Sequence, residues 1–203
     1  MTQLLPSEVP VPNGASVEFL RRSTQAAHER LEAGLAIAGP RPSDDDVLAY
    51  FAALYGWLAP VERALWSAAW PGAMAAAMRA AKLGWLADDL RAAGVDTEVL
   101  PRCGEPQPVA SVAARYGLAY VVEGSTLGGR VLARQLAAAG SRYANSRFLA
   151  GYGDETGAVW RTFRDLLELD VHTAADLADA AGAAVQAFAT LQRWLSRQDV
   201  FRA

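Results

Sequence analysis

The chain has 203 residues, of which 52% are hydrophobic and 20% charged, with 19 basic and 22 acidic side chains. This composition is typical of a globular protein and excludes disordered, fibrous and membrane-spanning classes. The formal net charge of −3 argues against nucleic acid as a partner, because binding to phosphate backbones needs a strongly basic face.

The single cysteine, Cys103, lies in the Pro/Gly-rich segment PRCGEPQP. One cysteine allows neither a disulfide framework nor a thiolate metal cluster within the chain, so we expect a reducing, cytoplasmic compartment. The start MTQLLPSEVPVPNG has no basic segment followed by an apolar block, and no run of about 18 apolar residues occurs. We therefore expect no export signal and no membrane anchor.

The first element is an extended arm over residues 1–15, which contain three prolines and no periodicity. A single domain is expected over residues 16–203. It begins with a helix that starts at Ser16, a candidate N-cap, and closes at the Gly39-Pro40 break. Residues of the expected buried stripe recur in steps of three and four: Val17, Leu20, Thr24, His28, Leu31 and Leu35.

The next helical segments are separated by proline and glycine. A mostly apolar helix runs to Pro60, which is expected to begin a second helical piece that ends at Pro71. Another helix is predicted over residues 73–93, with Gly94 as its left-handed C-terminal residue. Residues 95–108 collect prolines and glycines and predict a surface loop.

Two segments have the spacing of a capping box, in which the N-cap side chain and the third helical residue satisfy each other's backbone N–H. Ser43 and Asp46 mark the start of the apolar helix, and Thr173 and Asp176 mark an amphipathic helix that reaches about Arg197. No segment alternates with a period of two, so the predicted fold class is all-α.

A long helix is predicted from about residue 109 to residue 139, although it contains internal glycines. Gly124, Gly128 and Gly129 lie at i, i+4 and i+5, and they leave a strip of backbone without Cβ atoms. Each disfavours a helix by about 1 kcal/mol relative to alanine, so something must offset the cost. A flat ligand pressed against the strip and a close helix–helix crossing both explain the pattern, and both remain open.

His28 is one of only two histidines, and it falls between Thr24 and Leu31 on the first predicted helix. It is either a core histidine satisfied by a local hydrogen bond or a single axial ligand to a haem iron, which needs a neutral imidazole facing an apolar crevice. Glu32, one turn further on, is either a solvated charge or the acceptor for the other ring N–H. The second histidine, His172, receives no role.

Two segments together resemble the motifs of one family. LRRSTQAAHERLE, residues 20–32, is similar to the proximal-helix motif of the haem oxygenases, and YVVEGSTLGGRVLARQL, residues 120–136, is similar to the distal helix of their bacterial branch. The likeness is greatest to the type that supplies biliverdin to bacterial phytochromes, and it runs in order from about residue 16 to residue 198. It implies an all-helical fold with haem b between the two helices.

The resemblance also implies roles for single residues on the proximal side. His28 would be the proximal iron ligand, and Glu32 would be its hydrogen-bonding partner. Arg21 takes the place of a basic residue that contacts a haem propionate. Tyr120 and Arg164 are candidate further neighbours of the propionates.

On the distal side the resemblance implies that Gly124, Gly128 and Gly129 bring helix backbone close to the haem. Ser125 stands where the animal enzymes carry an aspartate that organises water, and bacterial relatives share the serine. A peroxidase would instead place a polar side chain above the iron to cleave the O–O bond heterolytically.

The implied activity is the opening of haem, which is substrate and cofactor together, with O2 to biliverdin, CO and ferrous iron. The segment GSTLGG has no preceding strand and is not a dinucleotide loop, so we expect no nicotinamide or flavin site. Electrons would come from a separate ferredoxin or reductase, and a bacterial phytochrome is an expected recipient of the bilin.

The alternative functions belong to different classes. A haem carrier or chaperone would use the same histidine without turnover, and a helical adaptor would use His28 and the glycines only for packing. A di-iron protein is excluded because neither histidine follows a glutamate by three positions. A thiol hydrolase would require Cys103, which has no histidine near it in the sequence.

Overall fold

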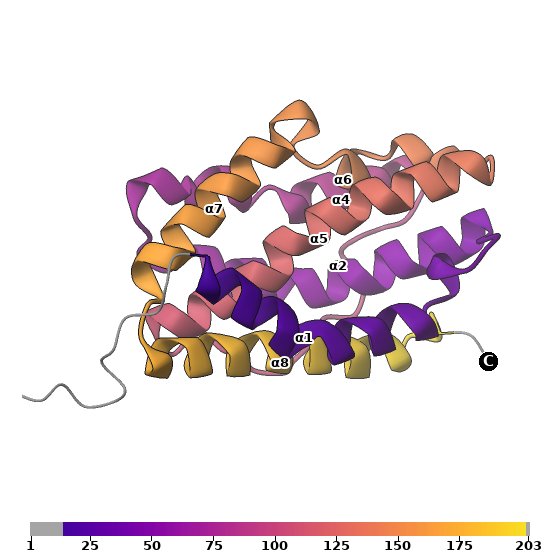
Figure 1. The fold of residues 1–203 in the computed structure, drawn as a ribbon. Helices are drawn as coiled ribbons and strands as arrows, with labels where there is room; N and C mark the ends of the chain where they lie inside the picture. The colour runs from indigo at the N-terminus through magenta and orange to yellow at the C-terminus, as the bar shows by residue number, and fades with distance from the viewer. Residues whose placement is uncertain (1–13, 202–203) are drawn as a thin grey trace, which may run out of the picture.

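The computed structural model describes residues 14–201, which form helices joined by short 3-10 turns and loops and contain no β-strand (Figure 1). The helices are α1 (Ala15–Gly34), α2 (Asp44–Trp66), α3 (Ala76–Arg79), α4 (Lys82–Ala92), α5 (Val112–Ala138), α6 (Arg147–Ala150), α7 (Thr156–Asp170) and α8 (Ala174–Ser196). The predicted all-α class is confirmed. Apart from Gly14 and Ala15, the arm predicted over residues 1–15 lies outside the described residues.

The long helix α5 crosses the middle of the molecule and packs most extensively against α8, while α1 lies along α8 on the near side (Figure 1). The core lies where these helices meet α2 and α7, and it includes fully buried Leu20, Phe51, Tyr116, Phe163 and Leu195. None of the helices between residues 14 and 201 combines the length and hydropathy that crossing a bilayer requires.

The start of α1 differs from the prediction. Gly14, with a φ of 81°, precedes the helix, and Ser16 lies inside it rather than capping it. The buried Ser16 hydroxyl donates a hydrogen bond of 2.7 Å to the carbonyl of Val171, and Glu168 on α7 accepts the backbone N–H of Ser16 and of Val17. A carboxylate from another helix thus caps α1, which the local sequence does not reveal.

Both predicted capping boxes are confirmed. Ser43 accepts the backbone N–H of Asp46, and the Asp46 carboxylate accepts that of Ser43. Thr173 and Asp176 form the same pair of bonds at the start of α8. These signals are correct because a capping box closes within four residues and needs no distant partner.

The predicted break at Pro60 is wrong, because α2 continues through it to Trp66. Proline removes the N–H that would bond to the carbonyl four residues earlier, on Gly56. That carbonyl instead accepts the backbone N–H of Cys103 at 3.0 Å. The loop over residues 95–108 lies mostly at the surface, as predicted, but Cys103 is buried against α2, where its N–H supplies this missing bond.

The single helix predicted over residues 73–93 is also wrong. Ala75 adopts a left-handed conformation with a φ of 49°, so the chain forms a 3-10 turn, then α3, then α4. Gly94, with a φ of 82°, follows the end of α4 as predicted. The long helix is confirmed as α5, capped by Ser111 and followed by Gly140 with a φ of 74°.

Candidate functional site

Helices α1 and α5 run in the same direction, lie close at one end and diverge toward the other (Figure 1). Near the close end the hydroxyl of Tyr120 on α5 lies close enough to the side chain of Thr24 on α1 for Thr24 to lower the pKa of Tyr120. Thr24 is buried and donates its own hydroxyl to the carbonyl of Leu20 at 2.8 Å. One turn beyond this contact lie His28 on α1 and Gly124 on α5.

One face of α5 in this diverging part is open. By helical spacing it comprises Tyr120, Gly124, Leu127, Gly128 and Val131, which we call the glycine face. A Cβ atom built on Gly124 or Gly128 would meet no neighbouring heavy atom within 4 Å. Leu127 and Val131 are 37% and 47% exposed, so the glycine face presents bare backbone flanked by uncovered apolar side chains.

A close helix–helix crossing was the alternative explanation for the glycines of α5. In the structure this explanation holds for Gly117. A Cβ atom on Gly117 would overlap the carbonyl oxygen of Ala180, so Gly117 is what lets α5 approach α8. On Gly129 it would make only ordinary contacts, at 3.6 Å from Leu149. Packing among the described residues therefore explains Gly117 but not Gly124 or Gly128.

His28 lies one turn beyond Thr24, at the margin of the buried stripe of α1. Its side chain is 52% exposed, and its ring packs edge-on against Phe188 of α8 at 5.6 Å between ring centroids. The ring Nδ1 lies 3.5 Å from a carboxylate oxygen of Glu32, and no described residue hydrogen-bonds Nε2. The structure thus does not place His28 in the core, and it leaves one ring nitrogen available for a ligand.

The three candidate propionate neighbours lie toward the close end of α1 and α5. Arg21 makes two hydrogen bonds to Glu18, of 2.8 and 2.9 Å, and its positive charge acts on the nearby Tyr120. Burial raises the pKa of Tyr120, while the nearby Thr24 side chain and the charge of Arg21 lower it. Arg164 is exposed on α7, one turn beyond Trp160, whose ring contacts that of Tyr120 at 6.0 Å.

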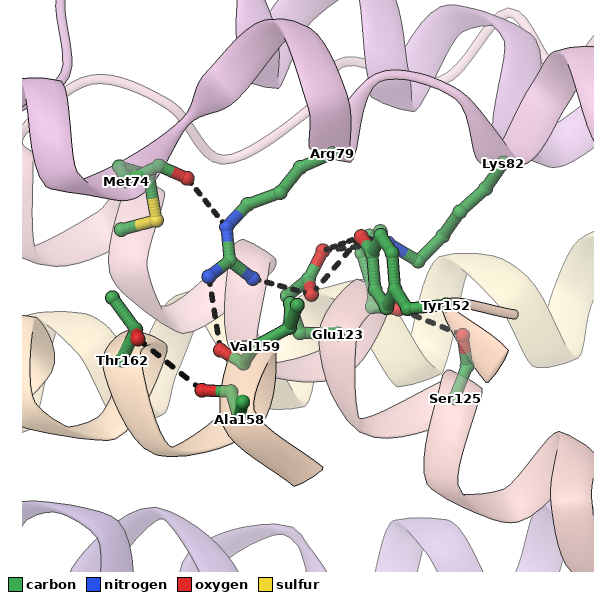
Figure 2. Close-up of polar contacts among 10 residues, drawn as sticks. Met74, Arg79, Lys82, Glu123, Ser125, Tyr152, Ala158, Val159 and Thr162 are labelled. Carbon is green, nitrogen blue, oxygen red and sulfur yellow. Dashed lines mark hydrogen bonds and ion pairs between the residues drawn. The ribbon is translucent and has the colours of Figure 1, made fainter. Parts of the chain in front are cut away.

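Ser125 lies beside the glycine face and is exposed. Its hydroxyl donates a hydrogen bond of 2.7 Å to the carbonyl of Val122 in the same helix (Figure 2). The hydroxyl oxygen keeps its capacity to accept a hydrogen bond. Residues 124–131 contain two hydroxyl side chains, the exposed Ser125 and the buried Thr126.

Tyr50 on α2 belongs to the same region and is absent from the sequence prediction. Burial raises the pKa of Tyr50 to about 12, and the negative charge of Glu32 adds to the effect. Tyr50 therefore lies near the Glu32 carboxylate and stays protonated at neutral pH. Its position on an otherwise apolar helix carries no signal of this contact.

A second group missed by the sequence analysis lies behind α5. Arg79, Lys82, Glu123 and Tyr152 form a buried ion cluster, in which the first three side chains are at most 2% exposed (Figure 2). Glu123 accepts hydrogen bonds from Arg79 at 2.5 Å and from Lys82 at 2.6 Å. Burial lowers the pKa of Lys82, although the nearby Glu123 raises it. The available signals were a glutamate inside the apolar run AYVVEGS and the only lysine of the chain.

The residues between α1 and α5 fit a haem group. Within residues 14–201 no three His, Cys, Asp or Glu side chains gather into a metal site, and the imidazole that lies between α1 and α5 is that of His28. A single imidazole is enough when a porphyrin supplies the other ligands. The open backbone at Gly124 and Gly128 leaves room for a flat ring opposite that imidazole.

Comparison with known proteins agrees with this geometry. Residues 15–197 match the family model described as "Heme oxygenase". A curated protein named "Heme oxygenase" from Xanthomonas campestris pv. campestris (strain 8004) is 40% identical over 115 residues, which are 56% of this chain and 66% of that protein. The alignment thus spans just under two thirds of the relative. A crystal structure of the NO- and CO-bound heme oxygenase of Neisseria meningitidis shares the fold, with a TM-score of 0.67 and 19% identity over 93% of this chain and 96% of that one.

Proposed function

The chain belongs to the heme oxygenase family, and from that premise we propose that it binds haem b between α1 and α5 and opens it with O2 to biliverdin, CO and ferrous iron. One observation carries the proposal: the backbone at Gly124 and Gly128 faces open space, on the face of α5 that continues from the Tyr120–Thr24 contact toward His28. If these glycines served helix–helix packing, a neighbouring helix would cover them.

On the proximal side His28 supplies the imidazole that ligates the iron. The Glu32 carboxylate, 3.5 Å from Nδ1, would accept the Nδ1–H and so hold the ring in the tautomer whose Nε2 is free to ligate. When bound, haem supplies the iron at which O2 is reduced. The protonated Tyr50 adds a neutral hydroxyl near Glu32 and does not compete for the iron.

On the distal side the chain contributes backbone instead of a polar side chain. Gly124 and Gly128 would let the helix lie close to the porphyrin, whereas Gly129 faces Leu149 of α6 and lies outside the open strip. The glycine face carries no acid or imidazole that would promote heterolysis of an O–O bond at a bound haem. Ser125 offers the hydroxyl that holds a distal water.

At the close end Arg21, Tyr120 and Arg164 hold the propionates. Arg21 is an exposed guanidinium that a propionate can share with Glu18, and the Tyr120 hydroxyl is positioned by Thr24. Cationic contacts at this end together with His28 would orient a bound haem between the two helices.

The electrons come from a separate ferredoxin or reductase, because no nicotinamide or flavin fingerprint is present in the chain. We further propose that the reaction takes place in the reducing cytoplasm and that the bilin passes to a bacterial phytochrome. The motif YVVEGSTLGGRVLARQL supports this branch of the family.

The test is an absorption time course of the one-to-one haem complex with ascorbate or a reductase and ferredoxin, followed by chromatography of the bilin. Loss of the haem bands with formation of green biliverdin is the expected result. A complex that stays red, or bleaches without forming a bilin, would instead identify a haem carrier. Failure to bind haem at all would favour a helical adaptor.

A further inference from the structure

The buried ion cluster lies behind the start of residues 124–131 of α5, which we call the glycine segment. Glu123 is the residue before Gly124, and helical geometry separates their side-chain directions by about 100°. The glycine face looks toward α1, whereas the Glu123 carboxylate turns inward and is 1% exposed. The cluster therefore contacts α5 at Glu123, directly before the part of the helix whose glycine face no other element covers.

Several chain segments converge on this one carboxylate (Figure 2). Arg79 comes from α3, Lys82 from the first residue of α4, and Tyr152 from the loop before α7. The Tyr152 hydroxyl accepts a hydrogen bond from Lys82 at 2.5 Å and donates to Glu123 at 3.2 Å. The charge of Glu62 on α2 also acts on Lys82.

Arg79 is itself fixed by two backbone carbonyls. Its Nε donates to the carbonyl of Met74 at 2.6 Å, and its second terminal nitrogen donates to that of Val159 on α7 at 3.0 Å. The guanidinium is thus held by its surroundings before it meets Glu123. A carboxylate that bonds to it must take one position, and this constrains the rotation of α5 about its own axis.

Stability alone does not explain such a cluster. Removing two cations and a carboxylate from water is costly, and apolar side chains of similar size stabilise a core at least as well. The directional bonds of the cluster can instead fix the orientation of α5. This matters here because glycine at positions 124, 128 and 129 weakens the preference of this segment for a regular helix. We propose that Glu123, held by Arg79 and Lys82, is a positioning residue that sets the rotation of α5 so that the glycine face is presented to haem.

The inference rests on the proposed function for its consequence, but its first test uses the haem-free protein. Lys82→Met removes one cation and leaves the Arg79–Glu123 pair in place, and Glu123→Gln removes the charge at the centre. Amide hydrogen exchange is measured by residue, and thermal unfolding is measured in parallel. Both variants are expected to raise exchange rates over residues 124–131 at least tenfold more than over residues 47–58 of α2.

The control is Thr173→Ala, which lowers thermal stability by removing the capping box of α8 and makes no hydrogen bond to the buried ion cluster. At a matched loss of melting temperature it should leave the relative exchange of residues 124–131 unchanged. If Glu123→Gln does not fold, Lys82→Met with the same control decides alone. Exchange that rises evenly over the whole molecule in both the variants and the control would overturn the positioning role.

With haem bound, Lys82→Met is expected to lower the rate of biliverdin formation per bound haem at least tenfold, with the haem Kd within threefold of the parent. Thr173→Ala should change neither. An unchanged rate in a variant whose glycine segment exchanges faster would also overturn the inference. A parent protein that forms no biliverdin would overturn the proposed function alone, because the exchange comparison does not depend on turnover.

Discussion

At the scale of single residues, the candidate site depends on one imidazole and its carboxylate. His28 is half-exposed, packs against Phe188 and has Glu32 beside its Nδ1, so its Nε2 is the nitrogen available to iron. The exposed His172 instead has its Nδ1 2.8 Å from the carbonyl of Leu169. We therefore expect substitution of His28, but not of His172, to change haem binding and turnover.

His28→Ala is expected to abolish the absorption spectrum of imidazole-ligated haem and nearly all biliverdin formation. Glu32→Gln leaves the His28 ring present but holds its orientation less firmly. We expect turnover to fall about tenfold, which is at the low end of the loss usual for removing a partner of a metal ligand. Absorption spectra and bilin yields of the haem complexes measure both effects.

His172→Ala is the matched control and should behave like the parent protein. A parental spectrum in His28→Ala, or a lost spectrum in His172→Ala, would contradict the assignment of the ligand.

At the scale of elements, α5 performs two tasks with glycines of different kinds. Gly117 removes a side chain where the backbone of α8 passes, while Gly124 and Gly128 remove side chains where nothing passes. The sequence pattern of small residues is the same in both places. Only the neighbouring element distinguishes a packing glycine from one that faces open space.

Gly128→Ala is therefore expected to stabilise the haem-free protein by up to about 1 kcal/mol, because alanine is the better helix former and its methyl group meets no neighbour. The same methyl group would intrude on bound haem and reduce the biliverdin yield. Urea unfolding of the haem-free protein and the bilin yield per bound haem measure the two effects.

Gly117→Ala should show the reverse signs. Its methyl group overlaps the carbonyl of Ala180, so we expect a loss of about 1–3 kcal/mol in the free energy of unfolding, as is usual for overpacking. Turnover per folded molecule should be unchanged. A parental yield from Gly128→Ala would contradict the role of the glycine face.

At the scale of the whole molecule, the buried charges link stability to pH. Glu62 on α2 is 5% exposed, accepts the backbone N–H of Leu83 at 3.2 Å, and has one oxygen without a hydrogen-bond partner. Burial raises the pKa of Glu62 from 4.5 to about 7, against the opposing effects of the Leu83 N–H and the charge of Lys82. Glu123 acts in the same direction as burial.

The raised pKa means that folded Glu62 keeps a proton that the unfolded chain has already released. Its contribution to stability is complete below about pH 4.5 and is lost as the pH rises through about 7. Glu62→Gln cannot ionise, so its stability relative to the parent should increase between pH 5 and pH 8 by up to about 3 kcal/mol. Urea unfolding of both proteins across this range measures the difference.

Parallel curves for the two proteins would show that Glu62 titrates near its ordinary value. Glu98→Gln is a suitable control, because Glu98 is exposed and its substitution should leave the pH dependence unchanged.

Part of this molecule could be predicted because the determining interactions are local. A capping box closes within four residues, so Ser43 and Thr173 identify the starts of α2 and α8 without any tertiary contact. The long α5 helix and the all-α class follow from periodicity in the same way. The resemblance of residues 20–32 and 120–136 to one family led to the family that the comparison with known proteins shows.

The remaining features depend on partners distant in the chain. Pro60 does not end α2 because Cys103 bonds to the carbonyl that proline leaves free, and Ser16 does not cap α1 because Glu168 does. Lys82 and Glu123 are 41 positions apart, and nothing in either local segment indicates that they meet. Hydrogen bonds and ion pairs of this kind are decided when helices pack, since burial forces each polar group to find whichever partner the fold brings near.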